Sequence, residues 1–574
     1  MSETRPIIRG TRGCVASSNY MATAAGFEIL VAGGNAFDAA VATGLALHVV
    51  EPHMNSIGGE APAIAYSSTQ KKVLAISGQG TAPEAATPKF FRDHGINLIP
   101  GDGFLPATVP ASFDLWITML AKFGTMSLRE VVTPAIRLAA RGFPVYPTLE
   151  RNIKAHAARF LKEWPTTARV FLPNGKLLVT GQVLVQKELA RTLHRLVEAE
   201  KRAGSDRLQG LVAAREYFYS GPIAREIVKF GSSNPVMDSS GERHTCLIDL
   251  NDLSEYETRI EDTVGTDYRG LRIHKCGPWS QGPVFLQQLR LLEGYDLPRM
   301  GHNSPDYIHL ITEASKLAFG DRERFYGDPL FTDVPLRRLL SREYAKKQRR
   351  LISMRRARVE PASGSVASAH NRPPLSSDLR GDTTHLDVAD SEGNMVSITP
   401  SGGWIWSSPV IEGLGFPLGT RGQMFSLDES HPNVLAPRKR PRTTLSPTLV
   451  TFNNKPLMAF GTPGGDQQDQ WTLQFFLNFT EFGMNLQAAI DAPTFHNSHF
   501  PSSFYPRDAH PGFLHLEARI PSDVRRKLKR KGHHIVLEDD WANGRVTAIH
   551  FNKHEGVISA AASSRYQTPY AMGV

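Results

Sequence analysis

The sequence predicts an α+β fold in a chain of 574 residues. Three observations support this prediction. Apolar stretches with helical spacing fill much of the chain up to residue 350, strand-like stretches dominate after residue 382, and a Pro-, Gly- and Ser-rich segment separates the two parts. The apolar content of 41% and the charged content of 21% are those of an ordinary globular protein.

The N-terminal region is predicted to form a strand followed by two helices. The stretch GCVASS is strand-like, and Ala, Leu and Val then recur with helical spacing from Ala22 to Leu47. Gly33-Gly34-Asn35 interrupts this stretch as a helix stop, and Asp38 opens the next turn. The segment EPHMNSIGGEAPAIAYSS predicts a loop and then an alternating strand.

The middle of the chain mixes both kinds of element. Helical patterns cover residues 107–142, 180–231 and 304–350, and the last of these is rich in Arg and Lys. Strands are predicted at His244–Leu250 and Ile273–Cys276.

The segment from Arg355 to Asp382 has an unusual composition. It contains Pro, Gly, Ser and Ala with almost no large apolar residue, so it cannot bury a core. We predict that it is flexible, and the alternative interpretation is an exposed linker between two domains. The apolar pattern restarts at Leu386, directly after it.

The C-terminal part is predicted to be rich in strands, with one helix at Asp466–Phe482. The predicted strands are 384–389, 395–400, 446–452, 456–461, 534–538 and 546–551.

Thr383 and Thr384 lie at the open end of the first predicted hairpin of this part, where its first strand begins. A threonine hydroxyl needs a base to become nucleophilic, and a chain N-terminus provides an α-amine with a pKa of about 7.7–8.0. Thr383 therefore becomes a candidate nucleophile if its hydroxyl attacks the Asp382 carbonyl and the bond between these residues breaks. The alternative is that threonine begins this strand only because of its β-propensity.

Two further motifs offer matching chemistry. The first motif, Thr462-Pro463-Gly464-Gly465, precedes a predicted helix. Glycine N–H groups and the positive end of the helix dipole could stabilise an oxyanion that develops there. The alternative is that the motif is a plain tight turn. Thr443 and Thr444 follow Arg442 and could hold a carboxylate, or they could be ordinary strand residues beside a surface arginine.

The basic charge of the chain raises the question of nucleic acid. The formal net charge is +9 and the pI about 9.3. The densest basic run, residues 525–531, has no interleaved aromatic residues and no reading motif. We predict that it is a solvated helix face, with steering of anionic substrates as the alternative. No nucleic-acid partner is expected.

Other classes of protein are also disfavoured. No apolar stretch approaches the roughly 20 residues that cross a bilayer, and the start of the sequence shows no signal peptide. Cys14, Cys246 and Cys276 match no zinc or disulfide pattern, so we expect a cytoplasmic protein without a membrane partner. Neither a G-x-S-x-G elbow nor a P-loop is present.

Two groups of histidines could suggest a metal site, but exposed loop residues are the simpler interpretation, and we expect neither a metal nor an organic cofactor. The first group is His496, His499, Asp508 and His510, and the second is His533, His534, Asp539 and Asp540.

Taken together, these motifs resemble the γ-glutamyltransferase (γ-glutamyltranspeptidase) family over nearly the full length. The matching stretches include VASSNYMATAAGFEILVAGGNAFDAAVATGLALHVVEPHMNSIGGEAP, LPATVPASFDLW, DSEGNMVSIT, KRPRTTLSPT and GTPGG. The resemblance implies the four-layered αββα sandwich of the N-terminal-nucleophile hydrolases. It also implies one structural domain built by a large piece, 1–382, and a small piece, 383–574, which associate as a heterodimer, with further pairing of heterodimers as an open alternative.

The resemblance also implies roles for individual residues. Thr383 is the catalytic threonine released by cleavage after Asp382, and Ser401 stands where the family has a threonine that hydrogen-bonds the nucleophile. The remaining implied assignments are Gly464 and Gly465 for the oxyanion hole, Thr443 and Thr444 for a substrate carboxylate, and Gln423 for the α-amino pocket.

Three departures from the family pattern argue against γ-glutamyl transfer to an amino acid. Phe425 and Ser426 replace an acidic pair that grips the substrate ammonium. Gly403 replaces an asparagine, and Gln79 replaces the arginine that pairs with the α-carboxylate. Losing a paired carboxylate or a bidentate arginine would each cost more than about 1 kcal/mol of binding.

The stretches SITPSGGW and GLGFPLGTRGQMF look more like the hydrolytic branch of the family, with its cephalosporin or glutaryl acylases and oxamate amidohydrolase. We therefore predict an autoprocessed amidohydrolase acting on a small carboxylate-bearing amide, with Arg421 or Arg442 supplying positive charge. Trp404 and Trp406 could wall the pocket or pack against a sheet. The alternatives are a γ-glutamyl hydrolase or transferase acting on glutathione-like substrates, and a binding protein that keeps only the scaffold.

Overall fold

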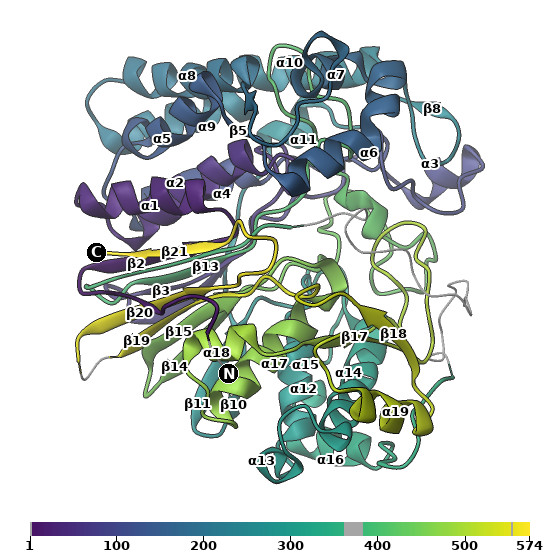
Figure 1. The fold of residues 1–574 in the computed structure, drawn as a ribbon. Helices are drawn as coiled ribbons and strands as arrows, with labels where there is room; N and C mark the ends of the chain where they lie inside the picture. Colours follow the sequence, from purple (N-terminus) through teal and green to yellow (C-terminus); the bar gives the residue numbers. More distant parts are fainter. Residues whose placement is uncertain (1–2, 361–382, 553–554) are drawn as a thin grey trace.

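The computed structural model describes residues 3–360, 383–552 and 555–574. These residues form four layers, with two seven-stranded sheets face to face and helices on the outer side of each sheet (Figure 1). The predicted α+β class and the αββα sandwich are therefore confirmed. No helix among these residues is long and apolar enough to cross a membrane.

The first sheet combines strands from both sides of residues 361–382. Its order is β21-β2-β12-β13-β3-β4-β9, and every neighbouring pair is antiparallel. The strands are β21 (Tyr570–Gly573), β2 (Gly13–Ser17), β12 (Leu386–Asp390), β13 (Met395–Ile398), β3 (Ala63–Ser67), β4 (Lys72–Ile76) and β9 (Ile260–Asp262). The predicted hairpin, β12 and β13, thus lies in the middle of the sheet.

The second sheet has the order β1-β20-β19-β15-β14-β11-β10, again with antiparallel neighbours. Its strands are β1 (Ile8–Gly10), β20 (Val557–Ala562), β19 (Thr547–Asn552), β15 (Lys455–Gly461), β14 (Thr448–Phe452), β11 (Leu271–Lys275) and β10 (Val264–Tyr268). The strand predictions for β11, β14, β15 and β19 are confirmed.

Helices from the first part of the chain cover the first sheet (Figure 1). They are α1 (Tyr20–Val31), α2 (Ala36–Val50), α3 (Pro88–Asp93), α4 (Ser112–Phe123), α5 (Leu128–Arg141), α6 (Pro147–Glu163), α7 (Pro165–Phe171), α8 (Lys187–Arg202), α9 (Arg207–Tyr219), α10 (Pro222–Ser233) and α11 (Leu250–Ser254). Short strands accompany them: β5 (Phe143–Pro144), β6 (Val183–Leu184), β7 (Val236–Met237) and β8 (Arg243–His244).

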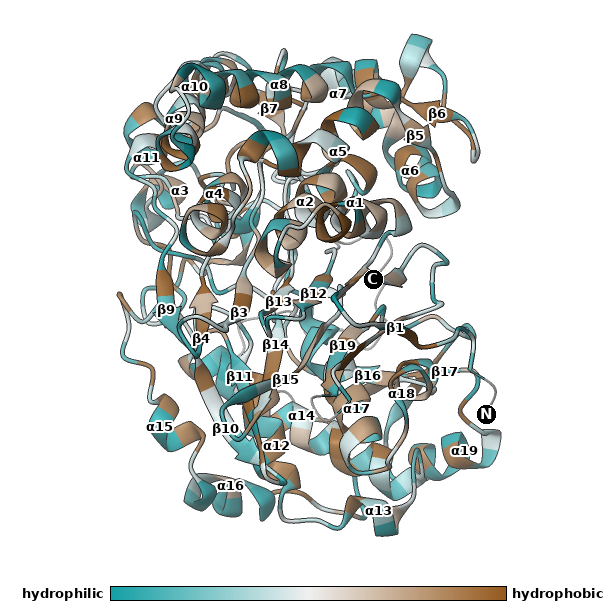
Figure 2. Cartoon of the chain, turned by 90° about the vertical axis from the view of Figure 1, so that its left-hand side faces the viewer, coloured by the Kyte–Doolittle hydropathy of each residue, from teal (hydrophilic) through white to brown (hydrophobic). Residues whose placement is uncertain are grey.

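A second group of helices covers the other sheet. They are α12 (Pro283–Leu292), α13 (Leu297–Met300), α14 (Pro305–Phe325), α15 (Leu336–Leu339), α16 (Arg342–Arg349), α17 (Gln468–Thr480), α18 (Leu486–Asp491) and α19 (Ser522–Arg530). Figure 2 shows α16, on the outside, as strongly hydrophilic.

The predicted break between the first two helices is confirmed, and its cause is a capping box. The Asn35 side chain accepts hydrogen bonds from the N–H groups of Phe37 and Asp38, and the Asp38 carboxylate accepts from the Asn35 N–H. Every residue of α2 is buried, which explains its continuous apolar composition.

The predicted strand at His244–Leu250 is wrong beyond its first residue. Only Arg243–His244 pairs as β8, and Asp249 then caps α11 by accepting from the Asp252 N–H at 2.8 Å. A capping box here competes with the apolar run Cys246–Ile248 and ends the extended stretch.

A small third sheet was only partly predicted. Strand β18 (His534–Glu538) was expected, but β16 (Phe495–Asn497) and β17 (Phe513–Glu517), which pair beside it, were not. Before β18, the basic run lies in α19, which buries Val524 and Leu528 and exposes its charges. The prediction of a solvated helix face is therefore confirmed.

Most of the predicted flexible segment, and the proposed cleavage position Asp382, lie outside the described residues. Of the part that is described, Ala357 is buried and its N–H donates to the Lys531 carbonyl at 2.7 Å.

Candidate active site

The hairpin places Thr383 beside Ser401. Leu386 pairs with Ile398 at the ends of β12 and β13, and Thr383 continues this register by pairing with Ser401 in an antiparallel bridge. The two side-chain oxygens are 3.2 Å apart, and both residues are fully buried. The sequence expectation that these two hydroxyls meet therefore agrees with the structure.

Ser401 is held by a buried ion pair that sequence reasoning missed. Its backbone exchanges two hydrogen bonds with Glu60, of 2.8 and 2.9 Å. Arg421 donates from Nη2 to Ser401 Oγ at 2.6 Å and from Nε to Glu60 Oε1 at 2.6 Å. Burial raises the pKa of the Glu60 carboxyl above its ordinary value, although Arg421 opposes this shift.

Arg545 joins the Thr383 strand to the glycine loop. Its Nη2 donates to the Thr383 carbonyl at 3.5 Å, and its backbone N–H donates to Thr462 Oγ1 at 2.9 Å, two residues before Gly464. Nearby, both ring nitrogens of buried His53 have no hydrogen-bond partner among the described residues. Burial, with help from Arg545, lowers the pKa of His53 to about 3.

The Gly464-Gly465 loop requires glycine at both positions. Their φ angles are 123° and 55°, a region that L-residues rarely adopt. A Cβ on Gly464 would lie 2.2 Å from Trp471, and one on Gly465 would lie 2.8 Å from Phe504. A 3₁₀ turn at Gly465–Gln467 then leads into α17, so the predicted helix begins two residues later than expected. The loop precedes a helix N-terminus, as the sequence indicated.

The predicted carboxylate-binding threonines lie next to this loop. Thr443 accepts from the Gln281 N–H at 2.8 Å through its carbonyl, and the Gln281 side chain donates to the Gly465 carbonyl at 3.3 Å. The buried Thr444 hydroxyl has no hydrogen-bond partner among the described residues. A buried polar group without a partner is costly, so Thr444 is well placed to meet a ligand.

Gln468 is a second polar group in this region that sequence reasoning missed. Its Oε1 accepts from the Ser446 N–H at 3.1 Å, which orients the amide. Its Nε2 finds no partner within the part of the chain that the structure describes. The only sequence signal was its position on the first turn after the glycine loop.

Arg442 binds residues other than Ser401. It is buried, in contrast to the surface position considered as an alternative, and its Nη2 pairs with Glu323 at 2.9 Å while Nη1 donates to the Arg322 carbonyl at 3.1 Å. Burial lowers the pKa of Arg442 to about 10, and Glu323 opposes the shift. Of the two candidate arginines, Arg421 is therefore the one in contact with Ser401.

Gln423 and Gln79 are both bonded to backbone atoms. Gln423 Nε2 donates to the Gly101 carbonyl at 2.9 Å and its Oε1 accepts from the Tyr505 N–H at 3.0 Å. Gln79 is buried, and its Nε2 donates to the Gly80 carbonyl at 3.3 Å. Their proposed roles in substrate binding stay predictions.

Gly403 could not be replaced by the family's asparagine without rearrangement. Its φ is 62°, and a Cβ there would lie 2.0 Å from Ser56 Oγ. The local backbone of this chain therefore favours glycine over asparagine at position 403.

Trp404 and Trp406 form a stacked pair near the site. Their ring centroids are 4.9 Å apart; Trp404 is fully buried and Trp406 is partly buried. The Arg421 guanidinium lies over the Trp404 ring at 5.3 Å. Trp404 thus packs against the arginine that reaches Ser401, whereas Trp406 stacks on His156 at 5.6 Å.

The expectation that the first histidine group lies in an exposed loop is wrong for three of its members. His496, His499 and His510 are buried. His496 lies in β16, which pairs with β17 in the small third sheet. His496 stacks on His515 with centroids 4.4 Å apart.

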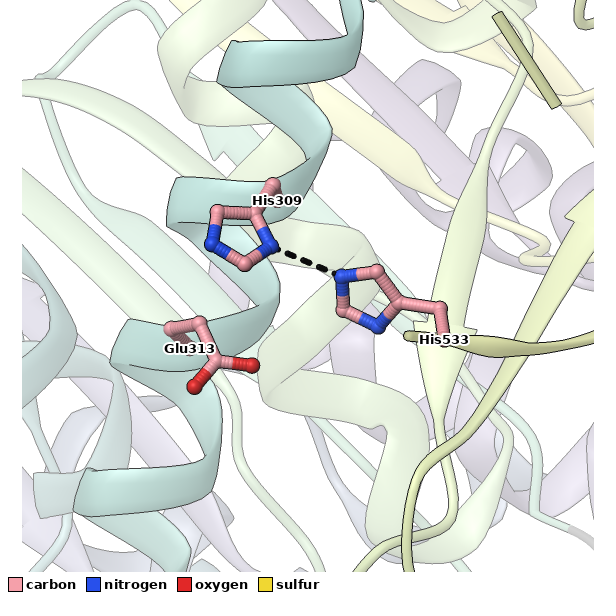
Figure 3. A group of neighbouring side chains, drawn as sticks. All are labelled: His309, Glu313 and His533. Atoms are coloured by element: carbon pink, nitrogen blue, oxygen red, sulfur yellow. Dashed lines mark hydrogen bonds between the residues drawn. The ribbon is translucent and has the colours of Figure 1, made fainter. Parts of the chain in front are cut away.

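In the second histidine group, His533 lies beside His309 and Glu313 and not with the predicted members of its group. Within the described residues, one set could gather three metal ligands: His309, Glu313 and His533 (Figure 3). His309 Nδ1 is 2.8 Å from His533 Nε2, and its Nε2 donates to the Ser353 carbonyl at 2.7 Å. Glu313 accepts from Lys316 Nζ at 2.7 Å. Of the histidine nitrogens in this set, His533 Nδ1 alone has no hydrogen-bond partner among the described residues. The other contacts join α14 to the residues before β18.

Comparison with known proteins agrees with this geometry. The family profile described as Gamma-glutamyltranspeptidase matches residues 22–572. The chain is 34% identical to the glutathione hydrolase-like YwrD proenzyme of Bacillus subtilis (strain 168), over 97% of this chain and 97% of that protein. It is also 34% identical to the acylase ACY 1 proenzyme of Pseudomonas sp. (strain V22), over 98% of this chain and 94% of that protein.

A solved structure extends the likeness to three dimensions. The crystal structure of cephalosporin acylase from Bacillus halodurans matches with a TM-score of 0.85 and 30% identity, over 100% of this chain and 98% of that chain. Relatives named as glutathione hydrolases and acylases are hydrolases of amide bonds, and so is this enzyme. The chain belongs to the γ-glutamyltranspeptidase family.

Proposed function

We propose that this protein is an autoprocessed N-terminal-threonine amidohydrolase that acts on an amide of a small carboxylate-bearing substrate. The observation that carries the proposal is the 3.2 Å contact between the Thr383 and Ser401 hydroxyls, with Arg545 linking Thr383 to the loop of Gly464 and Gly465. Nucleophile, hydroxyl partner and oxyanion donors therefore come from one connected region.

The proposed reaction has two steps. The Thr383 hydroxyl attacks the amide carbonyl, its proton passes to its own α-amine and then to the leaving amine, and an ester with Thr383 forms. Water then attacks this ester with the same α-amine as base, which releases the acid and restores Thr383. In both steps the N–H groups of the Gly464-Gly465 loop stabilise the negative oxygen.

Cleavage between Asp382 and Thr383 would supply the α-amine and divide the chain into a large and a small piece. The two pieces would remain together as a heterodimer, because β12 and β13 of the small piece lie between β2 and β3 of the large piece in one sheet. Separating them would break backbone hydrogen bonds along two strand pairs and expose the core.

The second candidate function is γ-glutamyl hydrolysis or transfer on glutathione-like substrates, which the names of several relatives favour. The residue at position 425 argues against this function, because Phe425 occupies the place of an acidic residue that would bind the substrate ammonium. Phe425 is fully buried in an apolar cluster with Phe91 and Leu105, so it offers nothing to a substrate ammonium.

The proposal is tested by weighing the protein and its Thr383→Ala variant under denaturing conditions. We expect pieces of 382 and 192 residues from the parent, the second beginning at Thr383, and one intact chain of 574 residues from the variant. Turnover of a panel of amides, and of glutathione with and without glycylglycine, then separates the two candidate functions. An uncut parent chain would remove the base and contradict the proposal.

A further inference from the structure

A serine, a histidine and a glutamate form a chain of hydrogen bonds on the small third sheet of β16, β17 and β18. Ser498 Oγ lies 3.2 Å from His515 Nε2, and His515 Nδ1 lies 2.7 Å from Glu538 Oε1. None of the three residues takes part in the proposed reaction at Thr383. Their order is that of a nucleophile, a base and a carboxylate that orients the base.

The strand register explains why these three side chains meet. His515 in β17 lies opposite His496 in β16 and opposite Val536 in β18. Ser498 follows His496 by two residues, and Glu538 follows Val536 by two residues. Because side chains alternate between the faces of a sheet, all three project from one face. Diagonal neighbours on one face are within reach of each other when one side chain is aromatic or long.

Backbone hydrogen bonds hold Ser498 in this position, one residue beyond the end of β16. Its N–H donates to the Phe513 carbonyl at 3.4 Å, and its carbonyl accepts from the His510 N–H at 2.9 Å. These bonds continue the pairing with the segment that enters β17. Ser498 is itself only partly buried, so a small molecule can approach its hydroxyl.

The two side-chain contacts determine which nitrogen of His515 carries the proton. A carboxylate only accepts hydrogen bonds, so Nδ1 donates to Glu538 and Nε2 keeps a lone pair. The Ser498 hydroxyl donates to this lone pair. The His515 ring is buried and stacks on His496, and burial holds the pKa of His496 well below its ordinary value. Of the two stacked rings, His515 is therefore the one placed to act as a base.

We propose that Ser498 is a second nucleophile of this protein, activated by His515 and Glu538, and that it hydrolyses small esters with an uncharged acyl group. Ser498 is partly buried, which limits the size of the acyl group, and the Glu538 carboxylate repels an anionic one. A triad is recognised by its geometry, so it needs no G-x-S-x-G elbow. All three residues follow position 383, so the site depends neither on cleavage nor on the proposed amidohydrolase function.

The proposed reaction is an acyl transfer in two steps. The Ser498 oxygen attacks the ester carbonyl carbon while its proton passes to His515 Nε2. The bond from the carbonyl carbon to the leaving oxygen then breaks, and the leaving alcohol takes the proton from His515. Water attacks the Ser498 ester with His515 again as the base, which releases the acid and restores the serine.

Trp471 and His496 separate this site from the oxyanion loop of the Thr383 site. A Cβ on Gly464 would lie 2.2 Å from the Trp471 ring, and that ring lies edge-on to His496 with centroids 5.3 Å apart. His496 in turn stacks on His515. A reagent that modifies Ser498 therefore reports a nucleophile other than Thr383.

The test is covalent labelling with diisopropyl fluorophosphate, a small uncharged reagent. The serine oxygen bonds to phosphorus, fluoride leaves, and the serine proton passes through the base to solvent. The parent and the Thr383→Ala variant are labelled and digested, and mass spectrometry locates the modified residue. Initial rates of p-nitrophenyl acetate hydrolysis by the Thr383→Ala variant report ester turnover without the first nucleophile.

Three variants and two matched controls are compared in the Thr383→Ala chain. The variants are Ser498→Ala, His515→Gln and Glu538→Gln. Ser254→Ala replaces an exposed serine at the end of α11. His274→Gln replaces a partly buried strand histidine whose ring nitrogens each lie 3.0 Å from a threonine hydroxyl.

We expect one adduct, on Ser498, in both the parent and Thr383→Ala. His515→Gln should slow labelling and ester hydrolysis about 10²- to 10⁴-fold, because it removes the base. Glu538→Gln should slow them about tenfold or more, because the amide no longer fixes the proton on Nδ1. Ser498→Ala should abolish both, and the two controls should behave like the starting chain.

Two results would overturn the inference. One is a Ser498 that stays unmodified while chymotrypsin in a parallel sample is fully labelled. The other is labelling at the same rate with and without His515, which would make the hydrogen bonds structural only. Glu538→Gln keeps the test decisive if His515→Gln does not fold, since 30% of the Glu538 side chain is exposed. An uncut parent would count against the Thr383 reaction alone, so the two failures are distinguishable.

Discussion

The Thr384 hydroxyl donates a 2.5 Å hydrogen bond to Oε2 of Glu51, at the C-terminal end of α2. Glu51 belongs to the large piece, and Thr384 follows the predicted nucleophile of the small piece. This contact therefore joins the residue next to Thr383 to the end of a fully buried helix.

Glu51→Ala should slow self-cleavage about tenfold or more, because a hydrogen bond to a charged group is worth roughly 1.5–3 kcal/mol and positions the reacting bond. The measurement is the disappearance of the full-length chain with time on denaturing gels. Thr384→Val should show a similar delay and Thr384→Ser little delay. Glu28→Ala, at an exposed glutamate, is the control, and equal rates in all variants would contradict the proposed role.

Ser401→Ala should lower kcat/KM about 10- to 100-fold, whereas Ser401→Thr should keep most of the activity. The alanine removes the hydroxyl that lies 3.2 Å from Thr383 Oγ1 and leaves the Arg421 donor facing a methyl group. Threonine keeps the oxygen. Rates are measured on variants shown by mass to be cleaved, and a threonine variant as slow as the alanine variant would count against the hydroxyl contact.

Gly464→Ala should lower kcat about 10²- to 10³-fold by moving an oxyanion donor, since the new Cβ would meet Trp471. Gly483→Ala is the matched control, because Gly483 also has a positive φ, of 63°, but open space around its Cβ position. Both variants carry the strain of about 1–2 kcal/mol of a left-handed L-residue. Similar kcat values in the two variants would show that strain, and not the donor, explains the loss.

The family resemblance implied the contact between Thr383 and Ser401, and the local register of the hairpin explains it. Strands 384–389 and 395–400 alternate around an evident turn, so residues eighteen apart fall opposite each other. The break between α1 and α2 was predictable for the same reason, since glycine and asparagine act on their immediate neighbours.

The contacts that position Ser401 were not predictable in this way. Glu60 and Arg421 are 361 residues apart, and their pairing depends on two loops that only the tertiary fold brings together. Arg442 shows the same limit: nothing in its neighbouring residues indicates that Glu323 and the Arg322 carbonyl enclose it. The surrounding Pro and Ser predict an exposed loop for His496, whereas the strand that contains it, β16, is buried and pairs with β17.

Glu323 lies between buried arginines and should make the stability of the protein depend on pH. Although burial raises its pKa, Arg442 and Arg322 oppose this and hold the pKa of Glu323 at about 2, below its ordinary value of 4.5. Because the pKa in the folded state is the lower one, ionised Glu323 stabilises the fold above pH 4.5. This stabilisation is lost as the pH falls from 4.5 toward 2.

Glu323→Gln should therefore lower the free energy of unfolding by about 3 kcal/mol at pH 7, and the difference from the parent should shrink steadily between pH 4.5 and pH 3. Urea unfolding at pH 7, 5, 4 and 3 measures both proteins, with Glu392→Gln, at an exposed turn residue, as control. A difference in unfolding free energy that stays constant down to pH 3 would mean that the altered packing of the side chain, and not its charge, accounts for the lost stability. A difference that shrinks as the pH falls toward 3 ties this arginine cluster to the ionised Glu323 carboxylate.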